Sequence, residues 1–217
     1  MVQKKSKLPE TRRPRGRPRQ YDPEQALTKA AESFWKNGYA GTSLDDLTAA
    51  TGMNRPSLYA AFGDKSDIYL KTLERYQKRS RDKSLELLGA STTLREFLTR
   101  FYQGALDIYR AGGDQARGCY SISTAPAQAV NDPAVRLFLS DSIRGTDAFL
   151  ADVIGKARER GEIAATADPF ALAQVATATL HTIAVRSRVG APRKQLTVLA
   201  AAAINLICGP ESKILGR

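Results

Sequence analysis

Apolar side chains recur at intervals of three and four residues through most of this chain, and almost no stretch alternates apolar with polar residues. A clear case lies between residues 22 and 38, where one helical face would carry Leu27, Ala30, Ala31, Phe34 and Trp35. This period is typical of amphipathic α-helices, whereas a half-buried strand repeats every second residue. The pattern predicts an all-α protein.

Capping residues and prolines mark where these helices begin, and glycines mark several of the ends. Asp22-Pro23, Asp132-Pro133 and Asp168-Pro169 each place a capping carboxylate before a proline in the first turn. The predicted helices cover about residues 22–38, 42–52, 54–63, 65–88, 92–110, 119–130, 132–160, 168–188 and 192–207.

Length and composition exclude several classes of protein. A chain of 217 residues can bury a sizeable core, and no segment approaches the roughly 20 apolar residues that span a bilayer. Cys119 and Cys208 lie far apart, so we expect no disulfide, and His181 is the single histidine. Without a nucleophile, phosphate or dinucleotide motif, we expect no enzyme, no cofactor and no metal site. The absence of an apolar signal core favours a cytoplasmic, nucleoid-associated protein without membrane contact.

The formal net charge of +11 is concentrated at the N-terminus. Residues 1–20 hold eight basic residues against Glu10, a segment charge of +7. We expect a flexible basic arm here, either merely solubilising or ordered by a polyanion such as DNA. The stretch Pro14-Arg15-Gly16-Arg17-Pro18 resembles an AT-hook core, which implies insertion of Arg15, Arg17 and the nearby Arg19 into A·T-rich minor grooves.

Two short helices joined around Gly52 and followed by a capped third helix form a helix-turn-helix pattern. In that motif the last helix enters the major groove with its N-terminal residues facing the bases. Here those residues are Asn54, Arg55, Pro56 and Ser57. Arg55 suits guanine, Asn54 suits adenine, and the Pro56 ring suits a thymine methyl. An ordinary three-helix bundle is the competing interpretation.

The same region resembles the N-terminal domain of the TetR family of transcriptional regulators. The resemblance rests on Phe34-Trp35-Lys36-Asn37-Gly38-Tyr39, Gly41-Thr42-Ser43-Leu44, Ala50-Thr51-Gly52-Met53, Ser57-Leu58-Tyr59-Ala60-Ala61-Phe62 and Asp64-Lys65. It implies an all-helical homodimer that binds a palindromic operator and releases it when a small molecule binds. It also implies phosphate contacts from Thr42, Tyr59 and Lys65, with Ser43 counted in the same DNA-binding surface.

The expected organisation is a basic arm over residues 1–20, a three-helix DNA-binding domain over 21–68, and a larger helical ligand-binding and dimerisation domain over 69–217. Small residues dominate the last two predicted helices, which favours them as the dimer interface, although packing inside one subunit is the alternative. Candidate pocket residues combine apolar or aromatic surface with a polar group, and ordinary core packing is the alternative for each: Tyr102, Tyr109, Cys119, Tyr120, Ser123, Phe138 and His181.

Cys119 supports a separate hypothesis. It begins a predicted helix beside Arg117, an arrangement that activates thiols toward electrophiles and oxidants, while a buried inert thiol is the competing interpretation.

The leading hypothesis is a ligand-released, dimeric repressor of double-stranded DNA. An architectural protein that binds A·T-rich DNA through its arm is the second hypothesis, and an enzyme is the third. The effector, the operator and the choice between repression and activation do not follow from the sequence.

Overall fold

A computed structural model describes residues 22–111 and 117–210 of the chain. Within these ranges the regular structure is entirely helical, as predicted. The helices are α1 (Pro23–Asn37), α2 (Leu44–Thr51), α3 (Arg55–Phe62), α4 (Lys65–Gly89), α5 (Leu94–Arg110), α6 (Tyr120–Gln128), α7 (Pro133–Glu159), α8 (Pro169–Arg188) and α9 (Arg193–Cys208).

Local capping explains where these helices start. The carboxylates of Asp22, Asp132 and Asp168 accept backbone N–H groups at the starts of α1, α7 and α8. Ser43 and Asp64 form capping boxes, in which the third helical residue returns a hydrogen bond to the cap. Because these interactions join residues two to three positions apart, the sequence alone could locate them.

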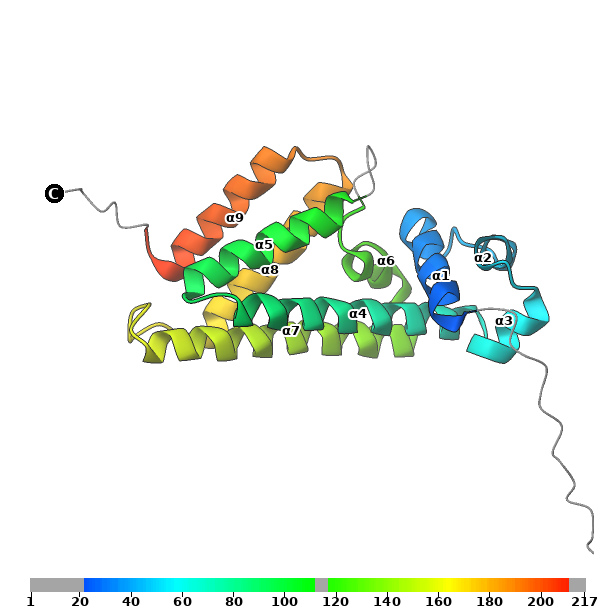
Figure 1. The fold of residues 1–217 in the computed structure, drawn as a ribbon, viewed down its shortest axis with the longest axis horizontal. Helices are drawn as coiled ribbons and strands as arrows, with labels where there is room; N and C mark the ends of the chain where they lie inside the picture. The colour runs from blue at the N-terminus through cyan, green and yellow to red at the C-terminus, as the bar shows by residue number, and fades with distance from the viewer. Residues whose placement is uncertain (1–21, 112–116, 211–217) are drawn as a thin grey trace, which may run out of the picture.

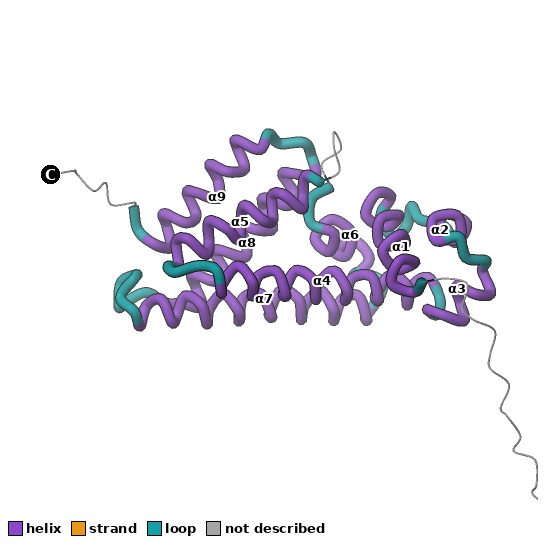
Figure 2. The backbone as a smooth tube through the Cα atoms, viewed as in Figure 1, coloured by secondary structure: helices purple, strands orange, loops and turns teal. Residues whose placement is uncertain are grey.

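The helices form an elongated molecule (Figures 1 and 2). α1, α2 and α3 cluster at one end, and α5, α8 and α9 pack together at the other. α4 and α7 lie beside each other along the length, and α6 sits between the two groups. We call α1, α2 and α3 the head of the molecule, and we call the helices from α4 to α9 its body.

The buried core forms two clusters, a larger one in the body and a smaller one centred on the head. The smaller cluster also contains side chains from helices of the body. Phe34, Leu47 and Leu58 pack with Tyr69 of α4. Tyr120 from α6 joins the same cluster and donates or accepts a 2.8 Å hydrogen bond at Thr72. The head is therefore seated on α6 by buried contacts, which matters for how the two parts communicate.

Candidate DNA-binding surface and effector cavity

The turn between α2 and α3 has the geometry of a helix-turn-helix. Gly52 ends α2 in the left-handed conformation, with φ at 72°, and Asn54 then caps α3. Leu58 and Phe62 bury the inner side of α3. The opposite side is left on the surface, including the whole first turn that Arg55 and Pro56 provide.

Arg55 is held by a neighbour in the structure. Its guanidinium pairs with the Asp45 carboxylate of α2 at 2.7 Å, and the two side chains are 56% and 76% exposed. The hydrogen bond to Asp45 raises the pKa of Arg55, which stays fully charged. Because exposed ion pairs are weak, Asp45 can orient Arg55 without preventing it from turning to a base.

Asn54 and Ser57 are engaged with each other at the start of α3. The Asn54 side-chain oxygen accepts the Ser57 backbone N–H at 2.9 Å. This bond uses the amide oxygen, so only the amide N–H₂ of Asn54 remains for a base edge. A two-bond reading of adenine would require the cap to break.

Thr42 and Ser43 lie side by side in sequence but in different environments. Thr42 is fully buried, and its hydroxyl donates to the Gly38 carbonyl at 2.8 Å. This placement does not support the phosphate contact expected from the Thr42 side chain, because its hydroxyl is turned into the fold. Ser43 is exposed at the N-terminus of α2, where its backbone N–H and its hydroxyl both donate to the Asp46 carboxylate at 2.7 Å.

Tyr59 lies on α3, and Lys65 begins the helix that follows it. The Tyr59 side chain is 42% exposed on α3 itself. Lys65 begins α4, and its ammonium lies 4.4 Å from the centre of the Tyr39 ring. Partial burial lowers the pKa of Lys65 from its ordinary value. The predicted arm residues Arg15, Arg17 and Arg19 lie outside the described residues.

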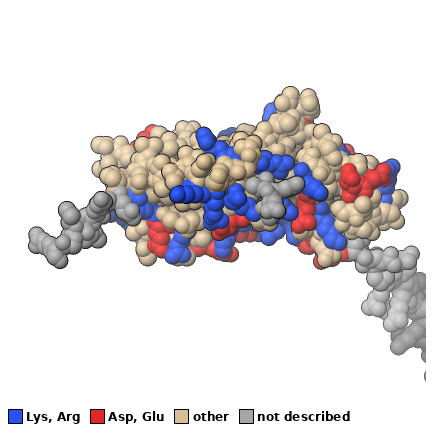
Figure 3. All heavy atoms as spheres, turned by 90° about the horizontal axis from the view of Figure 1, so that it is seen from above, with Lys and Arg blue, Asp and Glu red and all other residues tan. Residues whose placement is uncertain are grey.

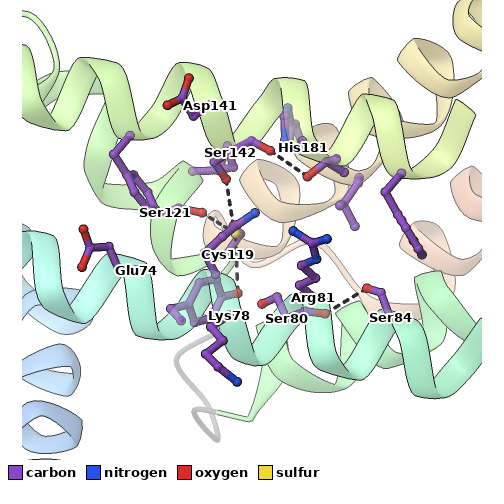
Figure 4. A pocket seen from close by; sticks show the side chains of 18 of the residues that line it. Glu74, Lys78, Ser80, Arg81, Ser84, Cys119, Ser121, Asp141, Ser142 and His181 are labelled. Atoms are coloured by element: carbon purple, nitrogen blue, oxygen red, sulfur yellow. Dashed lines mark hydrogen bonds between the residues drawn. The ribbon is translucent and has the colours of Figure 1, made fainter.

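A cavity of about 810 Å³ lies between α4 and α7 and reaches α5, α6 and α8 (Figure 4). Aromatic rings of Phe101, Phe138 and Phe149 contribute much of its apolar wall. The charged side chains that line it belong to exposed residues: Glu74, Lys78, Arg81 and Asp141. Most of the wall is therefore apolar or uncharged, and the Arg81 side chain adds a cation that reaches from α4 toward α7 (Figure 4), a composition typical of sites for small organic molecules.

Three of the predicted pocket residues line this cavity, namely Cys119, Phe138 and His181. Tyr102, Tyr109, Tyr120 and Ser123 are not among its lining residues. Tyr102 illustrates the reason, because its ring is buried in the core and its hydroxyl donates to the Ala176 carbonyl at 3.0 Å. These tyrosines complete the helical packing instead.

Sequence reasoning missed the wall that α4 supplies. Tyr76, Gln77, Ser80 and Ser84 all line the cavity from that helix. Small polar residues at helical spacing were the available signal, and basic residues occupy many of the positions between them. α7 supplies a similar missed row, including Ser142, whose hydroxyl donates to the Gln77 side chain at 2.8 Å.

Two groups in the cavity have defined chemistry. Cys119 caps the N-terminus of α6 and is 7% exposed, and its sulfur accepts the Tyr76 hydroxyl at 3.5 Å. Burial lowers the pKa of His181, although the Asp147 carboxylate opposes that shift. At pH 7 the His181 imidazole is therefore neutral and offers one donor and one acceptor.

The outer faces of α8 and α9 carry exposed apolar side chains. Val185 on α8 and Val189 directly after it are 53% and 78% exposed, and Val198 and Leu206 on α9 are 63% and 68% exposed. Viewed from the α9 side, Lys and Arg side chains form a band across the middle of the surface, and a group of acidic side chains lies at the helix-turn-helix end (Figure 3).

The described part of the chain contains no group of histidine, cysteine and acidic residues arranged to hold a metal ion. Among the same residues, no helix is both long and apolar enough to cross a membrane.

Comparison with known proteins matches the N-terminal and the C-terminal part of the fold to protein-family models. Residues 26–72 match the family model "Bacterial regulatory proteins, tetR family", and residues 94–203 match "Tetracyclin repressor-like, C-terminal domain". The chain belongs to the TetR family. It is a DNA-binding transcriptional regulator and not an enzyme, as its helix-turn-helix indicated.

Relatives of this TetR-family chain match it over most of its length. The HTH-type transcriptional repressor ComR of Escherichia coli is 28% identical over 88% of this chain and 91% of its own. The uncharacterized HTH-type transcriptional regulator YezE of Bacillus subtilis is 32% identical over 68% of this chain and 76% of its own. A cysteine mutant of the TetR-family regulator CifR, solved with a 26-bp operator duplex, has a TM-score of 0.80 at 28% identity and covers 87% of this chain and 98% of its own.

Proposed function

We propose that this chain is a homodimeric repressor that reads a palindromic operator through α3 and leaves it when a small molecule fills the cavity. The observation that carries the proposal is the first turn of α3, which presents Arg55 and Pro56 to solvent while Leu58 anchors the helix from behind. Base reading requires such a rigid and exposed turn.

In this proposal Arg55 is the main base-reading side chain. It leaves Asp45 and donates two hydrogen bonds to a guanine, exchanging an exposed ion pair for a bidentate contact in the groove. Asn54 adds a single donor because its oxygen caps α3. Pro56 contributes an apolar contact of the kind that recognises a thymine methyl.

Phosphate contacts position the protein without reading sequence. We assign them to the exposed Ser43 and Tyr59 and to the Lys65 ammonium, which border the same face. The basic arm, with Arg15, Arg17 and Arg19, extends the contact into a neighbouring minor groove.

Dimerisation through α8 and α9 follows from their exposed apolar faces. Val185 and Val198 are more than half exposed in the single chain, and pairing these helices with those of a second copy would cover them. A two-fold dimer presents two α3 helices related by symmetry, so its operator is a palindrome.

The effector is a small, mostly uncharged molecule with aromatic or alicyclic surface. The Phe101, Phe138 and Phe149 rings favour that surface, and the neutral His181 with the Ser142 hydroxyl would orient its polar groups. The regulator acts in the cytoplasm at the nucleoid, where its DNA is.

Selection of bound sequences from a random duplex pool tests the proposal. The intact protein should recover a palindrome, and Arg55→Ala should lose the specified base, at a cost of about 1–3 kcal/mol per contact. Arg79→Ala is the control, since Arg79 is exposed on α4 outside both sites. A protein lacking residues 1–19 should still recover the palindrome, but it should lose the flanking A·T preference and bind more weakly with a flatter salt dependence.

Recovery of A·T-rich sequence alone, unchanged by Arg55→Ala and abolished by removing the arm, would overturn the proposal. That result would favour the architectural function instead.

A further inference from the structure

One backbone carbonyl joins three helices from the two parts of the molecule. The Arg117 carbonyl oxygen accepts the Trp35 indole N–H of α1 at 3.2 Å. It also accepts the Arg188 guanidinium at the end of α8 at 3.2 Å and the Ser123 hydroxyl of α6 at 3.3 Å. A carbonyl has two lone pairs, so three donors make this a crowded centre. We call these four residues the Arg117 junction.

Arg188 also completes the end of α1. Its guanidinium donates to the Trp35 carbonyl at 2.9 Å and to the Lys36 carbonyl at 3.5 Å. The last carbonyls of a helix lack partners within the helix and carry partial negative charge, so a cation there is favourable. The body of the protein thus supplies the C-terminal cap of a DNA-binding-domain helix.

The backbone at the Arg117 junction packs closely against α8. Gly118 has a φ of 67°, and a Cβ there would lie 2.6 Å from the Ala184 carbonyl oxygen of α8. The N–H groups of Arg117 and Gly118 both donate to the Tyr109 carbonyl, at 2.8 and 3.1 Å. The segment is therefore fixed to α5 and pressed against α8, so its carbonyl has little freedom to follow α1.

The effector cavity reaches the junction through one ring contact. Tyr76 lines the cavity and meets the Trp35 ring edge to face, with centroids 5.4 Å apart. The Tyr76 hydroxyl also bonds the sulfur of Cys119, which lines the cavity two residues after Arg117. A molecule that displaces Tyr76 therefore presses directly on Trp35.

We propose that the Arg117 junction sets the orientation of the DNA-binding domain, with Arg188 as its positioning residue, and that cavity occupancy acts by displacing Tyr76 and releasing Trp35 from it. The inference rests on the proposed role of the cavity as the effector site. Packed interfaces switch between discrete arrangements and do not deform smoothly, so losing these hydrogen bonds frees α1 to reorient.

Trp35 makes the junction directly observable because it is the only tryptophan in the chain. Arg188→Met keeps the aliphatic stem but removes every donor. We expect red-shifted Trp35 emission, because α1 loses its contacts with Arg188, moves away from the Arg117 carbonyl and exposes the indole to water. Arg186→Met is the matched control, since Arg186 lies in the same last turn of α8 and is exposed. Unchanged emission in Arg188→Met would overturn the proposal whether or not an operator has been found.

A side chain built into the cavity can stand in for the unknown effector. Gly145 lines the cavity on α7, and a Cβ there would have no atom within 4 Å, so Gly145→Leu adds bulk at this wall with better helix propensity. We expect Gly145→Leu to shift Trp35 emission in the same direction as Arg188→Met. Each change should weaken binding to the selected operator about tenfold.

The double variant tests whether added bulk in the cavity and loss of Arg188 weaken operator binding through the same contacts or independently. If cavity bulk acts through Arg188, Gly145→Leu combined with Arg188→Met binds operator no more weakly than Arg188→Met alone. Arg188→Lys should recover part of the affinity, because it restores a cation at the end of α1. Independent losses that multiply to about a hundredfold would overturn the proposal while leaving operator recognition by α3 intact.

Discussion

At the scale of single residues, the proposed operator complex gives the side chains around α3 two kinds of role, reading bases and holding phosphate. In that proposal Arg55 has the first role and Lys65 the second. Mutation of the two kinds of side chain changes DNA binding differently. Loss of a base contact relaxes sequence specificity, whereas loss of a phosphate contact weakens binding to every sequence.

Lys65→Gln should weaken binding to operator and random duplex by similar factors. Each phosphate-neutralising cation contributes about 0.9 to the slope of log affinity against log salt, so a dimer should lose about 1.8 from that slope. Titrations at several salt concentrations measure it. Lys156→Gln provides the control, because Lys156 is exposed on α7 and pairs there with Asp152. An unchanged slope would remove Lys65 from the contact surface.

At the scale of helices, Asp132 joins the start of α7 to the start of α4. Its carboxylate accepts the Ala134 and Val135 backbone N–H groups at 3.0 and 3.2 Å and the Ser66 hydroxyl at 2.6 Å. The hydrogen bond from Ser66 is the largest cause that lowers the pKa of Asp132. One side chain thus caps a body helix and ties it to the helix that leaves the DNA-binding domain.

Asp132→Ala should lower the free energy of unfolding by about 1–2 kcal/mol at pH 7, since it removes a helix cap. The pKa of Asp132 is lowered in the folded state, so its ionic contribution is present above the unfolded pKa of about 3.9 and is lost as pH falls through the folded pKa. Denaturant unfolding from pH 7 to pH 3 measures both.

Asp132→Asn isolates the charge, because asparagine caps as well as aspartate. Its stability should differ least from that of the unmodified protein at the acidic end of the same series. A difference that grows as pH falls would contradict the assigned direction.

At the scale of the whole molecule, function depends on pairing two chains so that two α3 helices face one duplex. The apolar faces of α8 and α9 are the part of the described surface suited to this, and α8 also carries Arg188. The dimer interface and the Arg117 junction therefore share one rigid helix, so a change in pairing would reach the DNA-binding domain directly.

Leu206→Glu should disrupt that pairing. Burying an unpaired carboxylate costs about 3 kcal/mol or more, which corresponds to at least about a hundredfold weaker self-association. Val130→Glu is the control, because Val130 is 69% exposed beyond α6 and away from α8 and α9, while Leu206 is 68% exposed on α9. Analytical ultracentrifugation measures the dimer fraction. A Leu206→Glu protein that remains dimeric would place the interface elsewhere.

The sequence by itself determined the helices and the helix-turn-helix, because capping and amphipathic spacing act between residues within a turn or two of each other. Asp22, Ser43 and Asn54 cap their helices through neighbours two or three positions away. The exposed face of α3 could be predicted for the same reason, since α3 is short and its buried residues, Leu58 and Phe62, leave only one side exposed.

Only the tertiary structure decided which residues are buried and which meet across the chain. Thr42 turned inward because α1 offers it carbonyl partners, and Tyr102 joined the core while Tyr76 lined the cavity. The Arg117 junction brings together residues more than 70 positions apart in sequence. No periodicity encodes such contacts, because they depend on how α1, α6 and α8 pack against one another.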